Sequence, residues 1–283
     1  MGILNVTPDS FSDGGRFVDH AHAVAHGRRL LDEGAAIVDV GGESTRPGAA
    51  PLDEQTELAR VIPVVEALAP LGRVSIDTTK PAVARAAVAA GATVVNDVRA
   101  TLHEVAAETG ATWLAMHAQG EPRTMQVAPH YDDVVREVRD HLVVRARAAE
   151  AAGVGEVWID PGIGFGKTAA HNWALLRALP QLCDAGWPVA VGTSRKAFLG
   201  AALGHADGTD GPTPNDDRLE GSVATAVLAA AAGVSVLRVH DVAATVAALG
   251  AAGTVGRPGE ADGDRAARSA DADLDDREGG PWP

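Results

Sequence analysis

Short apolar segments rich in β-branched residues recur along the chain, and segments with helical periodicity lie between them. The apolar segments are mostly continuous rather than alternating, which is typical of parallel strands buried on both faces. We expect strands at residues 3–6, 36–40, 74–77, 93–97, 113–117, 157–160, 189–192 and 234–240. The intervening segments are rich in alanine and carry charged residues at helical spacing, as at residues 20–33, 53–68, 81–90 and 132–152.

Five glycines mark the ends of predicted helices, and the last of the five ends the helix before the final strand. The positions are Gly34, Gly91, Gly110, Gly153 and Gly233, where a left-handed C-cap is expected. Alternating strands and helices predict an α/β protein with a parallel sheet. Eight such units predict a (β/α)8 TIM barrel with a closed eight-stranded sheet, and the unbroken alternation favours it over an open doubly wound sheet.

The composition of the chain changes near residue 250. Of the 283 residues, 46% are hydrophobic, which is enough for one sizeable core. We therefore assign residues 1–250 to one catalytic barrel domain. Residues 251–283 are rich in glycine, aspartate and arginine and have few large apolar side chains, so we expect an acidic, disordered tail. Because the first predicted strand begins almost at Met1, we expect either a barrel floor without a covering segment or a trimmed start.

Charge and cysteine content exclude several classes of protein. The net charge of −14 argues against a nucleic-acid partner, which needs clustered cations. The chain opens without a basic signal-peptide region, and its longest apolar stretch, residues 224–237, is too short to span a bilayer. Cys183 is the only cysteine, which excludes an intramolecular disulfide and fits a reducing compartment. We expect a cytoplasmic protein that binds neither membranes nor nucleic acids.

Polar residues stand at the end of every predicted strand. A single one could be a helix cap or a loop residue, but the carboxyl ends of all barrel strands meet at one face, where TIM-barrel enzymes act. The pattern therefore predicts a polar active site at that face. The residues are Asn5, residues 43–46, Asp77, Asn96 with Asp97, His117, Asp160, residues 194–196, and Arg238 with His240.

The types of these residues indicate a ligand with a polar ring and a phosphate. Asp160 precedes Pro-Gly, and its carboxylate could accept two parallel hydrogen bonds from the 2-amino-pyrimidinone edge of a pterin or guanine. Asn96 could donate and accept along the same edge. Arg238 and His240 project from one side of the last strand, just before a helix that begins near Asp241, where anions are favoured.

Three further features restrict the chemistry. The segment 162–168, Gly-Ile-Gly-Phe-Gly-Lys-Thr, resembles a phosphate-binding loop, but Pro161 stands where a Walker A loop needs glycine, so an NTPase is disfavoured. Lys196 is a cation at the start of a predicted helix, where its charge opposes the helix dipole. A functional role for this lysine is therefore favoured over a role as a solvated cap. Cys183 lies in a predicted helix away from the strand ends, where a small buried hydrophobe is expected. With no nucleophile and no zinc pattern, we expect catalysis by positioning and electrostatics.

The motifs resemble those of the dihydropteroate synthases. Residues 2–15, Gly-Ile-Leu-Asn-Val-Thr-Pro-Asp-Ser-Phe-Ser-Asp-Gly-Gly, are similar to the opening signature of that family, and residues 41–48, Gly-Gly-Glu-Ser-Thr-Arg-Pro-Gly, to its second. Both contain long loops that we expect to be mobile lids. The other motifs follow in the family's order and are Ser-Ile-Asp-Thr (75–78), Asn-Asp-Val (96–98), Met-His (116–117), Asp-Pro-Gly-Ile-Gly-Phe-Gly-Lys (160–167), Ser-Arg-Lys (194–196) and Arg-Val-His-Asp-Val (238–242).

This resemblance covers about residues 1–250 and implies a pterin-binding TIM barrel of folate biosynthesis. The implied reaction condenses 6-hydroxymethyl-7,8-dihydropterin pyrophosphate with 4-aminobenzoate to give 7,8-dihydropteroate and pyrophosphate. The resemblance also implies a Mg²⁺ cofactor, a homodimer and a target of sulfonamides. The chain departs from the family pattern at Ala197, where serine is common, and at residues 99–101.

The resemblance assigns roles residue by residue. Asp77, Asn96, Asp160 and Lys196 match the positions that hold the pterin ring, with Arg238 along that pocket. Asn5, Arg238 and His240 match the pyrophosphate positions, and Asn5 also lies near the metal. Thr45, Arg46 and Pro47 match mobile elements of the aminobenzoate site, Phe165 and Ser194 lie on its aminobenzoate side, and Met116 is a further substrate contact. We take Lys196, Arg238, Asp77 and Arg46 as catalytic and give Arg195 no ligand role.

Two other functions compete with this interpretation. A methyltetrahydrofolate:corrinoid methyltransferase would share the pterin pocket but is expected to lack both loop signatures and the Ser-Arg-Lys segment. A non-catalytic paralogue that binds a pterin or a partner protein would be expected to lose a loop residue or the lysine, whereas Arg46 and Lys196 are both present.

Overall fold

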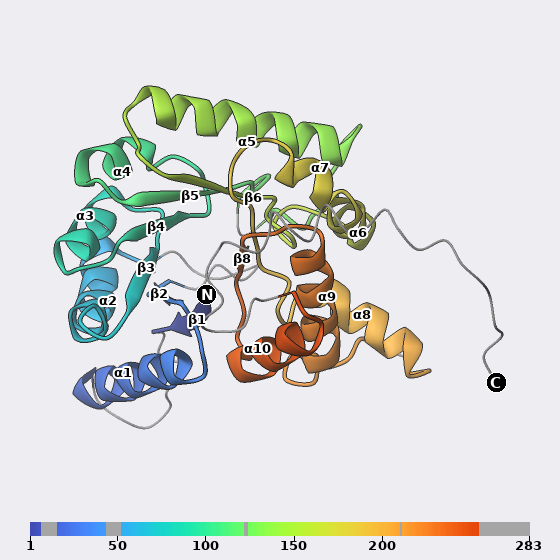
Figure 1. Cartoon of the computed structure of the whole chain (residues 1–283), viewed down its shortest axis with the longest axis horizontal. Helices are drawn as coiled ribbons and strands as arrows, with labels where there is room; N and C mark the ends of the chain where they lie inside the picture. The colour runs from blue at the N-terminus through green and yellow to red at the C-terminus, as the bar shows by residue number, and fades with distance from the viewer. Residues whose placement is uncertain (7–15, 44–51, 122–123, 210, 255–283) are drawn as a thin grey trace, which may run out of the picture.

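The computed structural model describes residues 1–6, 16–43, 52–121, 124–209 and 211–254. Helices surround a central group of strands (Figure 1). Eight strands are described, each overlapping one of the eight predicted segments. They are β1 (Gly2–Asn5), β2 (Ile37–Gly41), β3 (Arg73–Asp77), β4 (Val94–Asp97), β5 (Thr112–Met116), β6 (Val157–Asp160), β7 (Ala190–Val191) and β8 (Val236–Leu237). The bounds differ most at β8, because only two of the predicted residues 234–240 pair as a strand.

The strands close into a ring. β1 to β6 form one parallel sheet in chain order, and β7 pairs in parallel with β8. Two single bridges join these sheets, Ile159 with Val189 and Gly2 with Val239. The backbone N–H of Ile3 also donates to the carbonyl of Val239 at 2.9 Å. The predicted (β/α)8 barrel is therefore confirmed over an open doubly wound sheet.

The described helices follow the strands, and the last two connections each contain two of them. They are α1 (Arg16–Asp32), α2 (Glu54–Leu68), α3 (Pro81–Ala89), α4 (His103–Thr109), α5 (Val134–Ala151), α6 (Ala169–Arg177), α7 (Leu179–Cys183), α8 (Ala197–Ala206), α9 (Leu219–Ala231) and α10 (Val242–Ala251). The five glycines predicted to end helices are all left-handed, with φ between 70° and 109°. In the described ranges, no helix is long and apolar enough to cross a bilayer.

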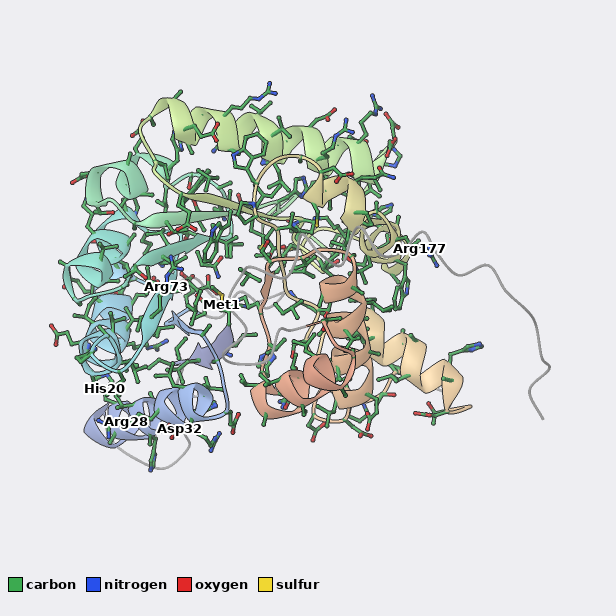
Figure 2. The ribbon with its side chains drawn as sticks, in the orientation of Figure 1. Met1, His20, Arg28, Asp32, Arg73 and Arg177 are labelled. Carbon is green, nitrogen blue, oxygen red and sulfur yellow. The ribbon has the colours of Figure 1, made fainter. Side chains whose placement is uncertain are left out.

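The barrel interior is apolar at one end and polar at the other. An apolar cluster of Ile37, Val94, Leu114, Trp158 and Ala190 fills the half near the strand starts, with Met1 packed against it. Figure 2 shows Met1 at the centre of the molecule, whereas Arg28 and Asp32 lie on the outer helix α1. Because side chains two residues apart share a face, the next inward positions lie towards the carboxyl ends. Those positions are Asp39, Asn96, Met116, Asp160 and Gly192.

The predicted division at residue 250 stays a prediction. Helix α10 ends at Ala251, and residues 255–283, which hold nearly all of the expected tail, lie outside the described ranges. The expected lid segment 7–15 also lies outside them, as do residues 44–51.

Candidate active site

A pocket opens at the carboxyl ends of the strands, with about 320 Å³ of empty space that includes open solvent. Three of the lining residues, Val98, Ile163 and Gly192, were not predicted. The lining residues that were predicted are Asp77, Asn96, Met116, Asp160, Phe165, Lys196 and Arg238.

Arg238 is bound to two carboxylates that lie on other strands of the barrel. Its Nε lies 2.6 Å from Oδ2 of Asp39, and its Nη2 lies 2.7 Å from Oδ2 of Asp77. The three residues come from β2, β3 and the end of β8, so the guanidinium crosses the top of the barrel interior. Two charge-assisted hydrogen bonds from one planar group fix its orientation in the pocket.

Asp39 is a site residue that the sequence analysis missed. Its side chain is fully buried, and its Oδ2 also accepts a hydrogen bond from Nδ2 of Asn96 at 3.0 Å. One carboxylate oxygen therefore orients both Arg238 and Asn96. Asp39 lies inside an otherwise apolar strand, where a lone inward-facing aspartate was the available signal.

Burial and mutual charge set the protonation of this cluster. Burial raises the pKa of Asp77 to about 7, although Arg238 acts in the opposite direction. Burial alone would lower the pKa of Arg238, but Asp39 and Asp77 raise it overall, so the guanidinium stays protonated. A carboxyl group that titrates near neutrality beside a fixed cation can hold or release a proton at the ligand.

Asp160 ends β6 on the other side of the pocket. Burial raises its pKa, while the backbone N–H of Gly162 opposes that shift by donating to Oδ1 at 2.7 Å. This hydrogen bond is the turn expected from Asp-Pro-Gly, and it leaves Oδ2 for a ligand. Met116 lies beside Asp160 in the strand register and adds an apolar wall.

The loop after β6 depends on left-handed glycines. Gly162, Gly164 and Gly166 have φ of 65°, 84° and 62°. A Cβ on Gly162 would lie 1.8 Å from the carbonyl oxygen of His117, so β5 and this loop approach as closely as glycine allows. The resemblance of this segment to a phosphate-binding loop is misleading, because Lys167 is only 3% exposed and points into the protein.

We expect Gly162→Ala to lower the free energy of unfolding by about 3 kcal/mol or more, since the Cβ adds a backbone clash to the cost of a left-handed alanine. Gly153 is the matched control, because it is also left-handed (φ 93°) but has no atom within 4 Å of a Cβ. Gly153→Ala should cost about 1 kcal/mol. Denaturant unfolding measures both, and equal losses would contradict the close approach.

Lys196 and Phe165 form one wall of the pocket. The Nζ of Lys196 lies 4.1 Å from the centroid of the Phe165 ring, which is a cation–π contact. Lys196 is the N-cap of α8 and makes no capping hydrogen bond through its side chain. Its position at the start of this helix, where a cation opposes the helix dipole, is the one expected from the sequence. Burial, followed by the charge of Arg238, lowers its pKa to about 8, against the effects of Asp160 and Asp77.

Ser194 and His240 lie next to each other but do not line the pocket. The Oγ of Ser194 is 2.9 Å from Nδ1 of His240 and accepts a hydrogen bond from the His240 backbone N–H at 3.2 Å. Burial, followed by the charge of Arg238, lowers the pKa of His240 to about 3, so the imidazole is neutral. His240 can therefore contribute a hydrogen bond to an anion, while Arg238 contributes the charge.

Arg195 lies between these groups and has a structural partner. Its guanidinium forms two hydrogen bonds with Asp241, at 3.0 and 2.6 Å, and its own φ is 58°. Its backbone N–H donates to Oγ of Ser222 at 2.9 Å. Arg195, Asp241 and Ser222 do not line the pocket, which agrees with the absence of a ligand role.

Two further strand-end residues, Asp97 and His117, do not line the pocket. The Oδ2 of Asp97 accepts hydrogen bonds from the backbone of Thr101 and Leu102 and from Nε1 of Trp113, which fixes the loop after β4. The Nδ1 of His117 lies 2.9 Å from Nζ of Lys167, and neither residue lines the pocket. Thr45, Arg46 and Pro47 lie outside the described residues.

Asn5 ends β1 level with Gly41 and Asp77 in the strand register. In the parts of the chain that are described, no group of three histidine, cysteine or acidic side chains could hold a metal ion. Mg²⁺ often binds through one or two protein oxygens together with waters and substrate phosphates. An amide oxygen beside the pocket fits that mode of binding, and a cage built from protein ligands alone does not.

The comparisons with known proteins agree on one family. The family described as "Pterin binding enzyme" matches residues 1–240. The dihydropteroate synthase of Mycobacterium leprae is 51% identical over 259 residues, covering 88% of this chain and 90% of that protein. The Xanthomonas albilineans dihydropteroate synthase with 4-aminobenzoic acid is 50% identical, with a TM-score of 0.81 over 89% of this chain and 90% of that one. The same enzyme in complex with 7,8-dihydropteroate is 47% identical, with a TM-score of 0.78 over the same shares.

Proposed function

Since this chain belongs to the pterin binding enzymes, and among them to the dihydropteroate synthases, we propose how its own residues divide the reaction of that family. The chain is a transferase of folate biosynthesis. It condenses 6-hydroxymethyl-7,8-dihydropterin pyrophosphate with 4-aminobenzoate, giving 7,8-dihydropteroate and pyrophosphate. The observation that carries the proposed division is the pocket lined by Asp77, Asn96 and Asp160 together with the cations of Lys196 and Arg238.

In our proposal, the acidic side of the pocket binds the pterin ring. Asp160 accepts two hydrogen bonds from the 2-amino-pyrimidinone edge through its carboxylate. Asn96, oriented by Asp39, donates and accepts along the ring, and Asp77 binds it with a carboxyl group that titrates near neutrality. Lys196 lies over the ring side of the pocket, on the face of Phe165.

The cationic side of the pocket stabilises the leaving group. When the bond between the pterin methylene and the pyrophosphate oxygen breaks, its electron pair leaves with pyrophosphate, and Arg238 offsets the charge that develops there. His240, which is neutral, donates a hydrogen bond. We also propose that Asn5 is a protein ligand of Mg²⁺, which when bound would supply further positive charge to the pyrophosphate.

The methylene carbon becomes positively charged as the leaving group departs, and the pocket carboxylates stabilise it. The lone pair of the 4-aminobenzoate amine forms the new C–N bond, and the nitrogen then releases one proton to solvent. We propose that the aminobenzoate ring binds against Phe165, with Ser194 on the same side. No side chain has to form a covalent intermediate, which fits a pocket whose described lining has no serine, threonine or cysteine.

The purified protein with Mg²⁺ should release pyrophosphate only when the pterin pyrophosphate and 4-aminobenzoate are both present. Binding of the pterin substrate without release of pyrophosphate would instead favour a non-catalytic pterin-binding protein. Release of pyrophosphate at the same rate without 4-aminobenzoate would contradict attack by the arylamine.

The activity should decrease at alkaline pH because Lys196 loses its proton. Its pKa is lowered to about 8, so the ammonium is present below that pH and disappears above it. We expect kcat/KM for the pterin substrate to fall above about pH 8, by up to about tenfold per pH unit. In Lys196→Ala this decrease should be absent and both affinity and turnover lower. An unchanged affinity and turnover in that variant would show that Lys196 lies outside the functional pocket.

We also propose a cytoplasmic homodimer. The resemblance to the family favours the dimer, and Leu228 on α9 and Val246 on α10 are exposed apolar side chains, 65% and 43% accessible, on two helices in contact. The cytoplasmic setting rests on the use of one cysteine in the whole chain. Light scattering of the purified protein measures the oligomeric state.

A further inference from the structure

The chain contains three lysines and 21 arginines, and none of the lysines is freely exposed. Lys196 lines the pocket. Lys80 lies between two glutamates, forming an ion pair with Glu43 and lying 2.5 Å from the buried Glu57. Lys167 is the most buried of the three and has no part in the proposed reaction. Since nearly all other cationic side chains of this protein are arginines, the lysine at position 167 indicates a need for a compact charged group with three donors.

The ammonium of Lys167 is surrounded by three acceptors. Its Nζ lies 2.9 Å from Nδ1 of His117, 3.3 Å from the carbonyl oxygen of His117 and 3.0 Å from the carbonyl oxygen of Phe165. Burial lowers the pKa of His117 to about 3, so this imidazole is neutral and its Nδ1 can accept. The three N–H donors of an ammonium therefore each have one acceptor.

These hydrogen bonds join two segments that are distant in sequence. His117 follows β5, and Phe165 lies in the loop after β6. The ring of Phe165 lines the pocket, whereas Lys167 does not. A second anchor acts on the same loop, because the hydroxyl of Tyr131 donates to the carbonyl of Gly166 at 3.0 Å. Lys167 and Tyr131 therefore hold the backbone carbonyls of Phe165 and of the next residue, Gly166.

The contacts of Lys167 differ from those of an ordinary buried ion pair. In the described chain, no carboxylate lies within ion-pair distance of its Nζ. Burial lowers the pKa of Lys167 to about 7, with the charge of Lys196 acting in the same direction and that of Asp160 against it. Two of its hydrogen bonds go to His117 after β5, and the third goes to the carbonyl of Phe165 in the loop that carries a wall of the pocket.

We propose that Lys167 is a positioning residue for Phe165, holding the loop after β6 against the end of β5 so that the ring forms the wall for the aminobenzoate. The inference rests on the proposed function, because it assumes that this substrate binds against Phe165. Lys167 acts through the backbone of Phe165 and makes no contact with either substrate. The pterin ring, bound by Asp77, Asn96 and Asp160, should be insensitive to Lys167.

The test is a double-mutant cycle of Lys167→Met and Phe165→Ala, with KM measured separately for the two substrates. We expect Lys167→Met to raise KM for 4-aminobenzoate about tenfold and to leave KM for the pterin pyrophosphate within about twofold. In the Phe165→Ala background, Lys167→Met should change KM for 4-aminobenzoate less than about twofold, because the ring it positions is gone. If Lys167→Met does not fold, Lys167→Gln, which keeps two donors, takes its place in the cycle.

The control is Arg145→Met on α5. Arg145 is also a cation that donates to a backbone carbonyl of a neighbouring loop, with its Nε 2.8 Å from the oxygen of Ala100, but neither residue lines the pocket. Both KM values should stay within about twofold. An equal rise in both KM values for Lys167→Met, or additive effects in the cycle, would overturn the inference. If Phe165→Ala alone leaves KM for 4-aminobenzoate unchanged, the proposed aminobenzoate site fails instead.

Discussion

Replacing Arg238 with methionine is expected to lower kcat/KM for the pterin pyrophosphate by about 1,000-fold or more. The variant loses the cation that offsets charge on the leaving group, an effect of about 3–4 kcal/mol for a preorganised group. It also leaves Asp39 and Asp77 without their shared partner in a buried site. Unpaired buried carboxylates should lower the free energy of unfolding by about 3 kcal/mol or more. Steady-state kinetics and denaturant unfolding measure the two effects separately.

Asp39→Asn should recover part of the lost stability in the Arg238→Met background, because it removes a buried charge that no longer has a partner. The control for position is Arg73→Met at the opposite end of the barrel. Arg73 donates to Thr93 and Thr112 and lies over the ring of Trp158, so it is a barrel arginine without access to the pocket. Its loss should leave kcat/KM within about twofold. Comparable kinetic losses in the two variants would contradict the role of Arg238.

Asp160→Asn is expected to weaken binding of a pterin by about 1,000-fold with little loss of stability. The asparagine keeps an oxygen for the backbone N–H of Gly162, so the turn after β6 can persist. Its amide would direct a donor at the N–H donors of the pterin edge, and a site that offers the wrong hydrogen-bonding group rejects its ligand by several kcal/mol. Isothermal titration calorimetry with a pterin measures the affinity.

Asp97→Asn is the matched control for that measurement. Asp97 is also a fully buried aspartate at the end of a strand, but it binds the backbone of its own loop and Trp113 rather than the pocket. The control should lose stability and keep its affinity for the pterin. If Asp97→Asn weakens binding as much as Asp160→Asn, the distinction between the two carboxylates is wrong.

The repeating strand and helix pattern was enough to predict the barrel and most of its pocket. Parallel strands bring their carboxyl ends together, so a polar residue at each strand end has a predictable neighbourhood even when its partner is 161 residues away, as for Arg238 and Asp77. The left-handed C-cap glycines were predictable because only local backbone sterics decide them.

The direction of each side chain was harder to predict. Asp97 and His117 directly follow Asn96 and Met116, and a shift of one residue along a strand turns the side chain to the other face. Counting in steps of two from the inward positions would have separated them. Asp39 was missed for a different reason. It lies inside an apolar strand, whereas the candidate polar residues were taken from the ends of the strands. Lys167 depends on contacts between two loops, which no local pattern encodes.

The distribution of lysine has a practical consequence for chemical labelling. All three amines of the lysine side chains lie in the barrel or at its rim, at Lys80, Lys167 and Lys196, while the outer helices carry arginine as their cation. A reagent that acylates amines therefore has no lysine on the outer surface to consume it, and among the side chains Lys196 is the one that lines the pocket. Protection of Lys196 by a bound ligand then becomes a direct read-out of pocket occupancy, by mass spectrometry and without any engineered label.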